Sequence, residues 1–207
     1  MRRRRSPRRL RRTSLAGLVL LLLLSLGYAF SPAKAVWSVR ELSNPAKLAT
    51  LGKRGANPRL NKIVYWLWEA RERGLPPETT ALTAQALNGV FGDRARLVAE
   101  SLARNVAIAD ELGLYTRENR ERLRHGGAAI VTQGPHAGQQ AEVDHVVPVS
   151  LAPEIGNELA NLGLLPEELN RQKSDRVGPR ELDHALALHR AGLLSTESLE
   201  MVRQAAD

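Results

Sequence analysis

The segment from Ala141 to Arg180 carries the side chains best suited to chemistry. Within it, a β-branched run holds an aspartate directly followed by a histidine, Asp144 and His145. Adjacent residues of a strand point to opposite faces, so these two side chains would have different tasks. A carboxylate can bind a metal ion, and an imidazole exchanges protons near neutral pH. The pair therefore predicts a metal ligand beside a general base.

The residues around this pair predict a strand, a loop, a second strand and a helix. Pro153 and Gly156 indicate an irregular loop, and the short apolar run over residues 161–165 predicts the second strand. A helix is predicted over residues 167–173, because Pro166 suits its first turn and two acidic residues suit its N-terminal end. This order of elements is a ββα unit.

The Asp-His pair is followed by two apolar residues and then by Pro148 and Ser150. An Asn-Leu step comes at Asn161, and Asn-x-x-Lys-Ser-Asp begins at Asn170. In this order, the residues resemble the HNH (ββα-metal) endonucleases. The HNH domain of the RNA-guided CRISPR effector nucleases is similar in the same order of residues. The resemblance covers residues 126–180, about a quarter of the chain.

The resemblance implies a role for each matched residue. Asp144 and Asn170 resemble the metal ligands, and His145 resembles the general base. Asn161 resembles the asparagine that fixes the loop and orients the base through the backbone. Lys173 lies one helical turn beyond Asn170, where it would stabilise charge on the phosphate in the transition state.

The types of these ligands restrict the metal. A carboxylate and an amide are hard oxygen donors that leave most coordination positions to water and substrate, which favours Mg²⁺ or Mn²⁺ over Zn²⁺. HNH proteins with histidines at these positions use softer metals, and this chain departs from them. We expect no small-molecule cofactor.

Basic residues gather in the predicted helix and just after it. Between residues 170 and 180 they outnumber the single acid, Asp175. We expect them to contact the nucleic-acid backbone, which carries no sequence information, and therefore to give little sequence preference. These candidates are Arg171, Lys173, Arg176 and Arg180.

The N-terminal segment, residues 1–35, is typical of an export signal. Residues 1–12 contain eight arginines, residues 15–26 are apolar and leucine-rich, and Ala33-Lys34-Ala35 fits a cleavage site. We predict a secreted or periplasmic protein that is cut after Ala35. The alternative is a membrane anchor that stays uncleaved, although the apolar run is short for a span. The arginines leave Sec and twin-arginine export both open.

This segment also accounts for the basic composition of the chain. Residues 1–35 hold nine of the 30 basic residues and none of the 22 acidic ones, so the formal net charge of +8 becomes −1 without them. The pI near 10.5 therefore belongs to the export signal. Any electrostatic attraction for a polyanion must be local to the site.

The rest of the chain is predicted to be mostly helical. Apolar residues at helical spacing predict a helical region over residues 36–125, and residues 181–207 predict two closing helices. The chain has no cysteine, so neither disulfides nor zinc knuckles can brace the ββα unit. We therefore expect an α+β, mostly α fold, with a helical N-terminal region packed on a ββα-metal unit at 126–180 and C-terminal helices.

Two further histidines are weighed against the Asp-His pair. Asp183-His184 lies in a helical segment with no Asn-x-x-Lys after it, so we assign it no chemistry. His136 lies in the turn before the first strand of the unit and is a weaker candidate for contact with a phosphate.

From these residues we expect an exported, metal-dependent HNH endonuclease that hydrolyses phosphodiester bonds by a one-metal mechanism. DNA is the favoured substrate, and RNA and the oligomeric state are left open by the sequence. The alternative is a non-catalytic ββα module of the cell envelope that binds nucleic acid or a protein. A nutrient nuclease, a toxin and a DNA-uptake factor are all compatible with these residues.

Overall fold

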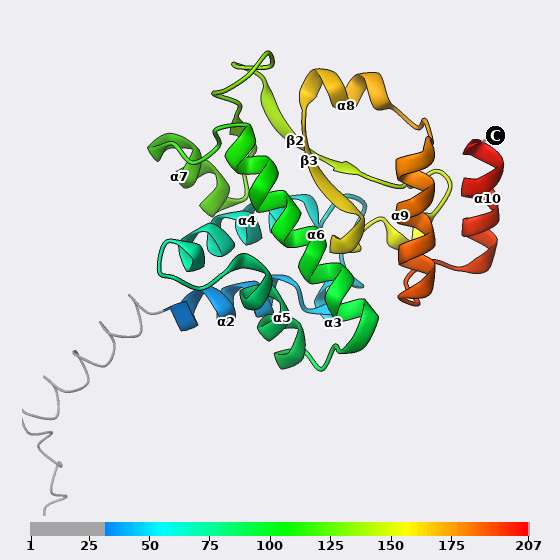
Figure 1. The fold of residues 1–207 in the computed structure, drawn as a ribbon, viewed down its shortest axis with the longest axis horizontal. Coiled ribbons are helices and arrows are strands. Elements are labelled where there is room, and N and C mark those ends of the chain that lie inside the picture. The colour runs from blue at the N-terminus through cyan, green and yellow to red at the C-terminus, as the bar shows by residue number, and fades with distance from the viewer. Residues whose placement is uncertain (1–31, 207) are drawn as a thin grey trace, which may run out of the picture.

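Apolar residues at helical spacing form the helices of the first half of the chain, as the sequence predicts. The computed structural model describes residues 32–206 and places a small sheet among these helices (Figure 1). The described residues form nine α-helices and one three-stranded antiparallel sheet, which confirms the α+β, mostly α class. Most of the predicted export signal, residues 1–31, lies outside the described residues.

The chain order separates the helices from the sheet. The N-terminal helices are α2 (Pro32–Leu42), α3 (Pro45–Leu48), α4 (Asn57–Arg71), α5 (Pro77–Leu87), α6 (Gly92–Glu111) and α7 (Arg117–His125). The remaining elements are β1 (Ala129–Ile130), β2 (Gln140–His145), β3 (Leu162–Pro166), α8 (Glu167–Lys173), α9 (Pro179–Arg190) and α10 (Thr196–Ala206). Two 3-10 turns, Pro153–Ile155 and Leu159–Asn161, interrupt the loop between β2 and β3.

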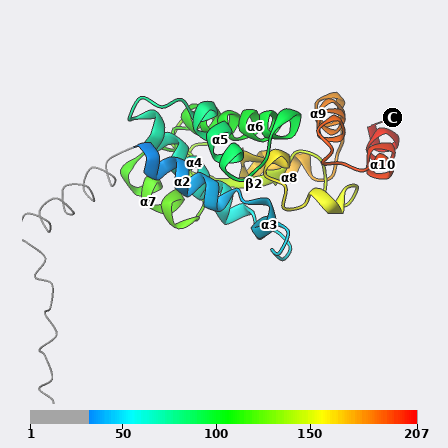
Figure 2. The ribbon, with the colours of Figure 1, turned by 90° about the horizontal axis from the view of Figure 1, so that it is seen from below.

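Helix α6 joins the helical region to the sheet. It packs against α4 and α5 and also against β3 and α9. Leu102 of α6, Leu67 of α4 and Leu162 of β3 are all buried in one continuous apolar core. The C-terminal helices α9 and α10 lie at the opposite end of the molecule from α7 (Figures 1 and 2). Because the core is continuous, packing can stabilise the sheet of a chain that has no cysteine for disulfides or zinc knuckles.

At each outer edge of the sheet, the side chain of an asparagine from a flanking helix forms hydrogen bonds with backbone groups of the edge strand. The strand order is β1-β2-β3. On the β1 edge, Asn119 of α7 accepts from Ile130 N at 2.8 Å and donates to Ile130 O at 2.7 Å. On the β3 edge, Asn105 of α6 accepts from Leu164 N at 2.7 Å and donates to Leu162 O at 3.0 Å. Neither edge is left with these backbone groups unpaired.

β1 and β2 form a hairpin in which β1 spans only two residues. The pairing of β1 with β2 covers Ala129 and Ile130. The chain then leaves the sheet because Thr132 N and Gln133 N donate to Leu112 O, next to the end of α6. In β2 and β3 the register places Asp144 opposite Gly163.

The cleavage position predicted after Ala35 falls inside α2. Ala35 and Val39 are fully buried, and α2 packs against α4 and α5. Residues 32–35 are thus part of the folded protein. Among residues 32–206, every helix is too short or too polar to cross a membrane.

Candidate functional site

The predicted metal ligands and the predicted base line one cavity. Asp144 and His145 are the last residues of β2, and Asn170 lies in α8. All three contribute to the wall of a cavity of about 970 Å³. This volume is at the upper end of the range for ligand-binding pockets. The fold therefore brings together three residues that the sequence singled out across 26 positions of chain.

The ring of His145 is held in one orientation by a backbone carbonyl. Its Nε2 lies 2.8 Å from Gly156 O, in the loop between β2 and β3. A carbonyl oxygen only accepts, so Nε2 carries the hydrogen in this bond. In the neutral ring, Nδ1 is then the nitrogen with the free lone pair. His145 is set to accept a proton at Nδ1.

Asn161 fixes the backbone that follows His145. Its side chain is fully buried. Oδ1 accepts from Val147 N at 2.8 Å, Nδ2 donates to Val147 O at 3.0 Å, and the main-chain carbonyl of Asn161 accepts from Val146 N at 2.8 Å. Asn161 does not line the cavity. These are the backbone contacts that a positioning role requires, and they leave it no contact with substrate.

Lys173 lies against the Asp-His pair and not in the large cavity. Its Nζ is 2.9 Å from Asp144 Oδ2 and donates to His145 O at 2.7 Å. It lines a separate cavity of about 80 Å³ that Asp144 and Arg180 also border. Lys173 therefore lines a different cavity from Asn170, and its contact with the same phosphate stays a prediction. The carboxylate of Asp144 and the carbonyl of His145, at the end of β2, determine the direction of the Lys173 side chain.

Glu142 orients Asn170, and sequence reasoning missed it. Asn170 Nδ2 donates to Glu142 Oε2 at 2.7 Å. Because the carboxylate holds the NH₂ end of the amide, Oδ1 is the atom left to coordinate an ion. Glu142 precedes Asp144 by two residues in β2, so the two acids share a face of the strand. The alternation of side chains along a strand was therefore the sequence signal from which Glu142 could have been found.

The donor set fits a hard divalent ion. Among residues 32–206, the hydrogen bonds and ion pairs engage Oδ2 of Asp144 and Nδ2 of Asn170, and Oδ1 of each side chain has no partner. The same part of the chain contains no group of three or more His, Cys, Asp or Glu that could hold a metal. An ion here would complete its shell with water and phosphate oxygens, as Mg²⁺ usually does.

Comparison with known proteins adds nothing to this geometry. No protein-family model, no curated protein and no solved structure matches the chain.

A partly buried carboxyl group in the same cavity was not predicted. Glu158 has a side chain that is 13% exposed and lies 3.3 Å from Arg94. Burial raises the pKa of Glu158, and Arg94 opposes that shift. A carboxyl group with a raised pKa inside a cavity is a frequent mark of a functional site. No sequence pattern indicated Glu158, because Arg94 is brought to it from α6.

The predicted phosphate contacts are dispersed. Arg171 lines the large cavity and pairs with Glu167 one turn earlier. Arg176 is exposed, and Arg180 borders the small cavity with Lys173. Of the four basic candidates, only Arg171 lines the cavity that holds Asp144 and His145.

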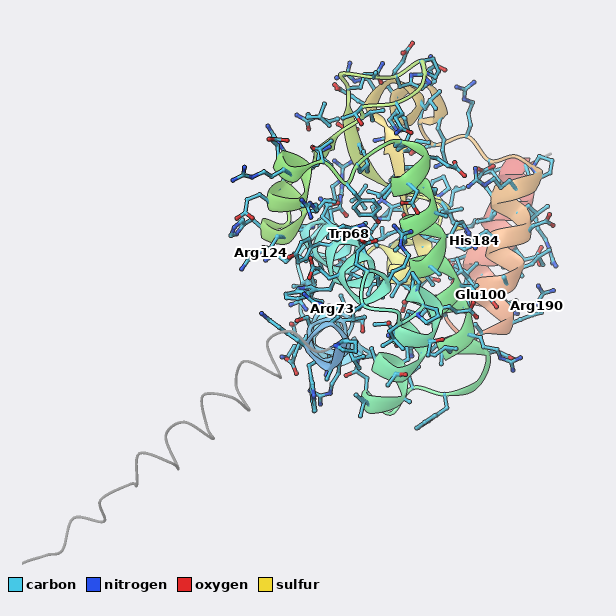
Figure 3. The ribbon with its side chains drawn as sticks, turned by 60° about the vertical axis from the view of Figure 1, so that its left-hand side comes forward. Trp68, Arg73, Glu100, Arg124, His184 and Arg190 are labelled. Atoms are coloured by element: carbon cyan, nitrogen blue, oxygen red, sulfur yellow. The ribbon has the colours of Figure 1, made fainter. Side chains whose placement is uncertain are left out.

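His184 and His136 lie outside the cavity that holds Asp144 and His145. His184 extends from α9 toward α6 (Figure 3) and is buried, with Nε2 2.9 Å from Ala160 O. This contact anchors α9 to the loop before β3. His136 Nδ1 lies 3.5 Å from Glu168 Oε2 and does not line the cavity.

Two strained residues border the cavity. Arg54 has φ of 60° and Ser174 has φ of 48°, and they are the only non-glycine residues with positive φ in the described part of the chain. Both line the cavity that holds Asp144 and His145. Such conformations typically cost about 1–3 kcal/mol each and concentrate at functional sites. Their position supports a function for this cavity.

Proposed function

We propose that the protein is a metal-dependent endonuclease of the HNH type that hydrolyses phosphodiester bonds in nucleic acid, with DNA as the favoured substrate. One observation carries the proposal. A carboxylate from β2, an amide from α8 and an oriented imidazole line the same cavity, in the order that the HNH resemblance implies. On this proposal, residues 126–180 are the ββα-metal unit, with the helical region packed on it and α9 and α10 as closing helices.

Asp144 and Asn170 would hold Mg²⁺ or Mn²⁺ through their Oδ1 atoms. When bound, the ion supplies charge stabilisation at the phosphate and at the leaving oxygen. Glu142 holds the amide of Asn170 so that its carbonyl end is available. Lys173 and Asn161 are positioning residues. Lys173 donates to the carbonyl of His145, and Asn161 accepts from the backbone N–H of Val147, two residues later.

His145 would act as the general base. Nδ1 takes a proton from the attacking water, and the hydroxide oxygen forms a bond to phosphorus as the bond to the leaving oxygen breaks. The leaving oxygen takes its proton from solvent. The hydrogen bond from Nε2 to Gly156 O keeps the ring in place and stabilises the imidazolium formed by this transfer.

We also propose that the protein acts outside the cytoplasm. The basic and apolar leader in residues 1–30 supports export to the periplasm or the medium. Retention of the leader would instead hold the nuclease at the membrane.

A plasmid-nicking assay tests the proposed activity. Protein comprising residues 32–207 is incubated with supercoiled DNA and, in parallel, with RNA, in Mg²⁺ or in EDTA. We expect nicked and linear DNA in Mg²⁺ and intact DNA in EDTA, because two protein donors cannot replace the ion. Intact DNA and RNA in both Mg²⁺ and Mn²⁺ would remove the proposal.

A second candidate function is favoured by the ion pair between Lys173 and Asp144. With the carboxylate already neutralised, the unit would be complete without a metal and would serve as a non-catalytic module that binds nucleic acid or a protein. The same assay separates the two functions. A binding module retards the DNA band in EDTA and in Mg²⁺ alike and does not cut it.

A further inference from the structure

Basic side chains from outside the ββα unit reach the candidate site. Four basic residues line the large cavity: Lys53, Arg54, Arg94 and Arg171. Arg94 pairs with Glu158, and Arg171 pairs with Glu167. Within residues 32–206, the side chains of Lys53 and Arg54 are exposed and form neither an ion pair nor a hydrogen bond. They are the two cations of this wall that remain free to neutralise another anion.

Lys53 and Arg54 lie in the loop of residues 49–56 between α3 and α4, and hydrogen bonds connect this loop to the candidate site. Asn157 Nδ2 donates to Leu51 O and to Gly52 O, both at 3.1 Å, and Asn157 Oδ1 accepts from Ala56 N at 3.1 Å. The preceding residue, Gly156, provides the carbonyl that orients His145. Two consecutive residues therefore position both the base and the basic loop.

The conformation of the loop fixes where the two cations lie. Arg54 has φ of 60°, in the left-handed region that arginine rarely occupies. The turn is closed by Gly55 N, which donates to Gly52 O at 3.0 Å, and a Cβ on Gly55 would lie 2.8 Å from Leu51 Cβ. A strained arginine persists where the surrounding structure holds it. The loop therefore holds Lys53 and Arg54 in a fixed position.

We propose that Lys53 and Arg54 bind the phosphate backbone of the nucleic-acid strand, next to the phosphate held at Asp144 and His145. The proposal rests on the function proposed above and deepens it. The strand would pass through the cavity between this loop and α8, and the contacts would be independent of base sequence because they involve phosphates. The helical region then supplies phosphate contacts in addition to those predicted for the basic residues of 171–180.

The test compares Lys53→Ala/Arg54→Gly with Arg117→Ala/Arg122→Ala. Glycine accepts the φ of residue 54, so the first variant loses its charges without strain on the loop. The control removes the same charge from exposed residues of α7 that do not line the cavity. Both pairs of substitutions are placed in a His145→Ala background, and binding of a fluorescent single-stranded oligonucleotide is measured in Mg²⁺ at several salt concentrations.

We expect the loop variant to bind at least tenfold more weakly at low salt. Loss of two phosphate contacts should lower the slope of log affinity against log salt by about 1.4 for a single strand. The control should retain the parent slope. Equal affinity and slope for loop variant and control would overturn the proposal, and so would a parent protein that binds no oligonucleotide at low salt.

Cleavage is a separate readout. If the loop variant binds weakly while the wild-type protein cuts no substrate, the phosphate contacts stand and the proposed nuclease activity fails. If the wild-type protein cuts DNA and the loop variant binds like its control, the activity stands and the loop contacts fail.

Discussion

The ammonium of Lys173 lies 2.9 Å from the carboxylate of Asp144, with both side chains 18% exposed. This pair occupies Oδ2 of the proposed metal ligand, so the cation and the metal ion compete for the same carboxylate charge. We predict that Lys173→Met binds Mn²⁺ more tightly, by on the order of 1 kcal/mol or about fivefold. Its cleavage rate at saturating metal should fall, because the contact with His145 O is also lost.

Titration calorimetry with Mn²⁺ measures this affinity directly. Arg176→Met is the matched control, since Arg176 is a nearby exposed cation without contact to Asp144. An unchanged Mn²⁺ affinity in Lys173→Met would mean that the ion pair does not oppose metal binding.

The hydrogen bond from Asn170 to Glu142 predicts a second effect on metal binding. Glu142→Leu frees the amide to rotate, and loss of such an orienting partner typically weakens metal affinity by about 10–100-fold. Glu142→Gln keeps an oxygen acceptor and should retain most of the affinity. The measurement is the Mg²⁺ concentration that gives half-maximal cleavage. Similar values for the leucine and glutamine variants would show that Glu142 does not position Asn170.

The backbone of Ser174 predicts a gain in stability upon mutation. Ser174 has φ of 48° at the end of α8, and glycine adopts this conformation without steric conflict. Ser174→Gly should raise the free energy of unfolding by about 1 kcal/mol and the Tm by about 2–4 °C. Thermal unfolding of this variant beside the wild-type protein checks the effect. A lower Tm for Ser174→Gly would show that the conformation is not strained.

Burial of His184 predicts a dependence of stability on pH. Burial lowers the pKa of His184 below its ordinary value of 6.5, and Arg104 and Arg180 add to the shift, while the Ala160 carbonyl and Glu181 oppose it. The unfolded chain therefore binds the proton more readily than the native protein, so stability falls as pH drops below about 6.5. The loss should be smaller in His184→Gln than in the wild type.

Chemical unfolding at pH 7.5 and pH 5.5 measures this difference. An equal loss of stability in His184→Gln and in the wild type would show that another group causes the acid sensitivity.

The burial of Ala35 predicts where the folded protein begins. Ala35 is fully buried within α2, so a chain that starts at Val36 lacks part of the core and the first turn of this helix. We predict that residues 32–207 unfold at a higher temperature than residues 36–207. Equal melting temperatures would leave cleavage after Ala35 without a structural cost.

The parts of the site that lie close together in sequence were predictable from it. Asp144 and His145 are adjacent, and Asn161 and Asn170 follow at spacings that place them on the loop and helix of a ββα unit. The helices of the first half also follow from apolar periodicity. In each case the signal is local, because strand alternation and helical spacing act over a few residues.

The parts that depend on distant segments were not predictable. Asn157 holds the basic loop through a bond to Ala56, 101 residues away in the chain. No period or motif connects Lys53 with the Asp-His pair. Lys173 shows the same limit, since helical spacing places it one turn from Asn170 and only the end of β2 directs its side chain to Asp144.

The most direct measurement compares plasmid cleavage in Mg²⁺ by the wild-type protein, His145→Ala and the control His125→Ala. Removal of a general base typically lowers the rate by about 10²–10⁴-fold, so His145→Ala should leave the plasmid supercoiled at enzyme concentrations where His125→Ala cuts it completely. Circular dichroism verifies that both variants are folded. Cleavage by folded His145→Ala at the wild-type rate would contradict the assignment of His145 as the base.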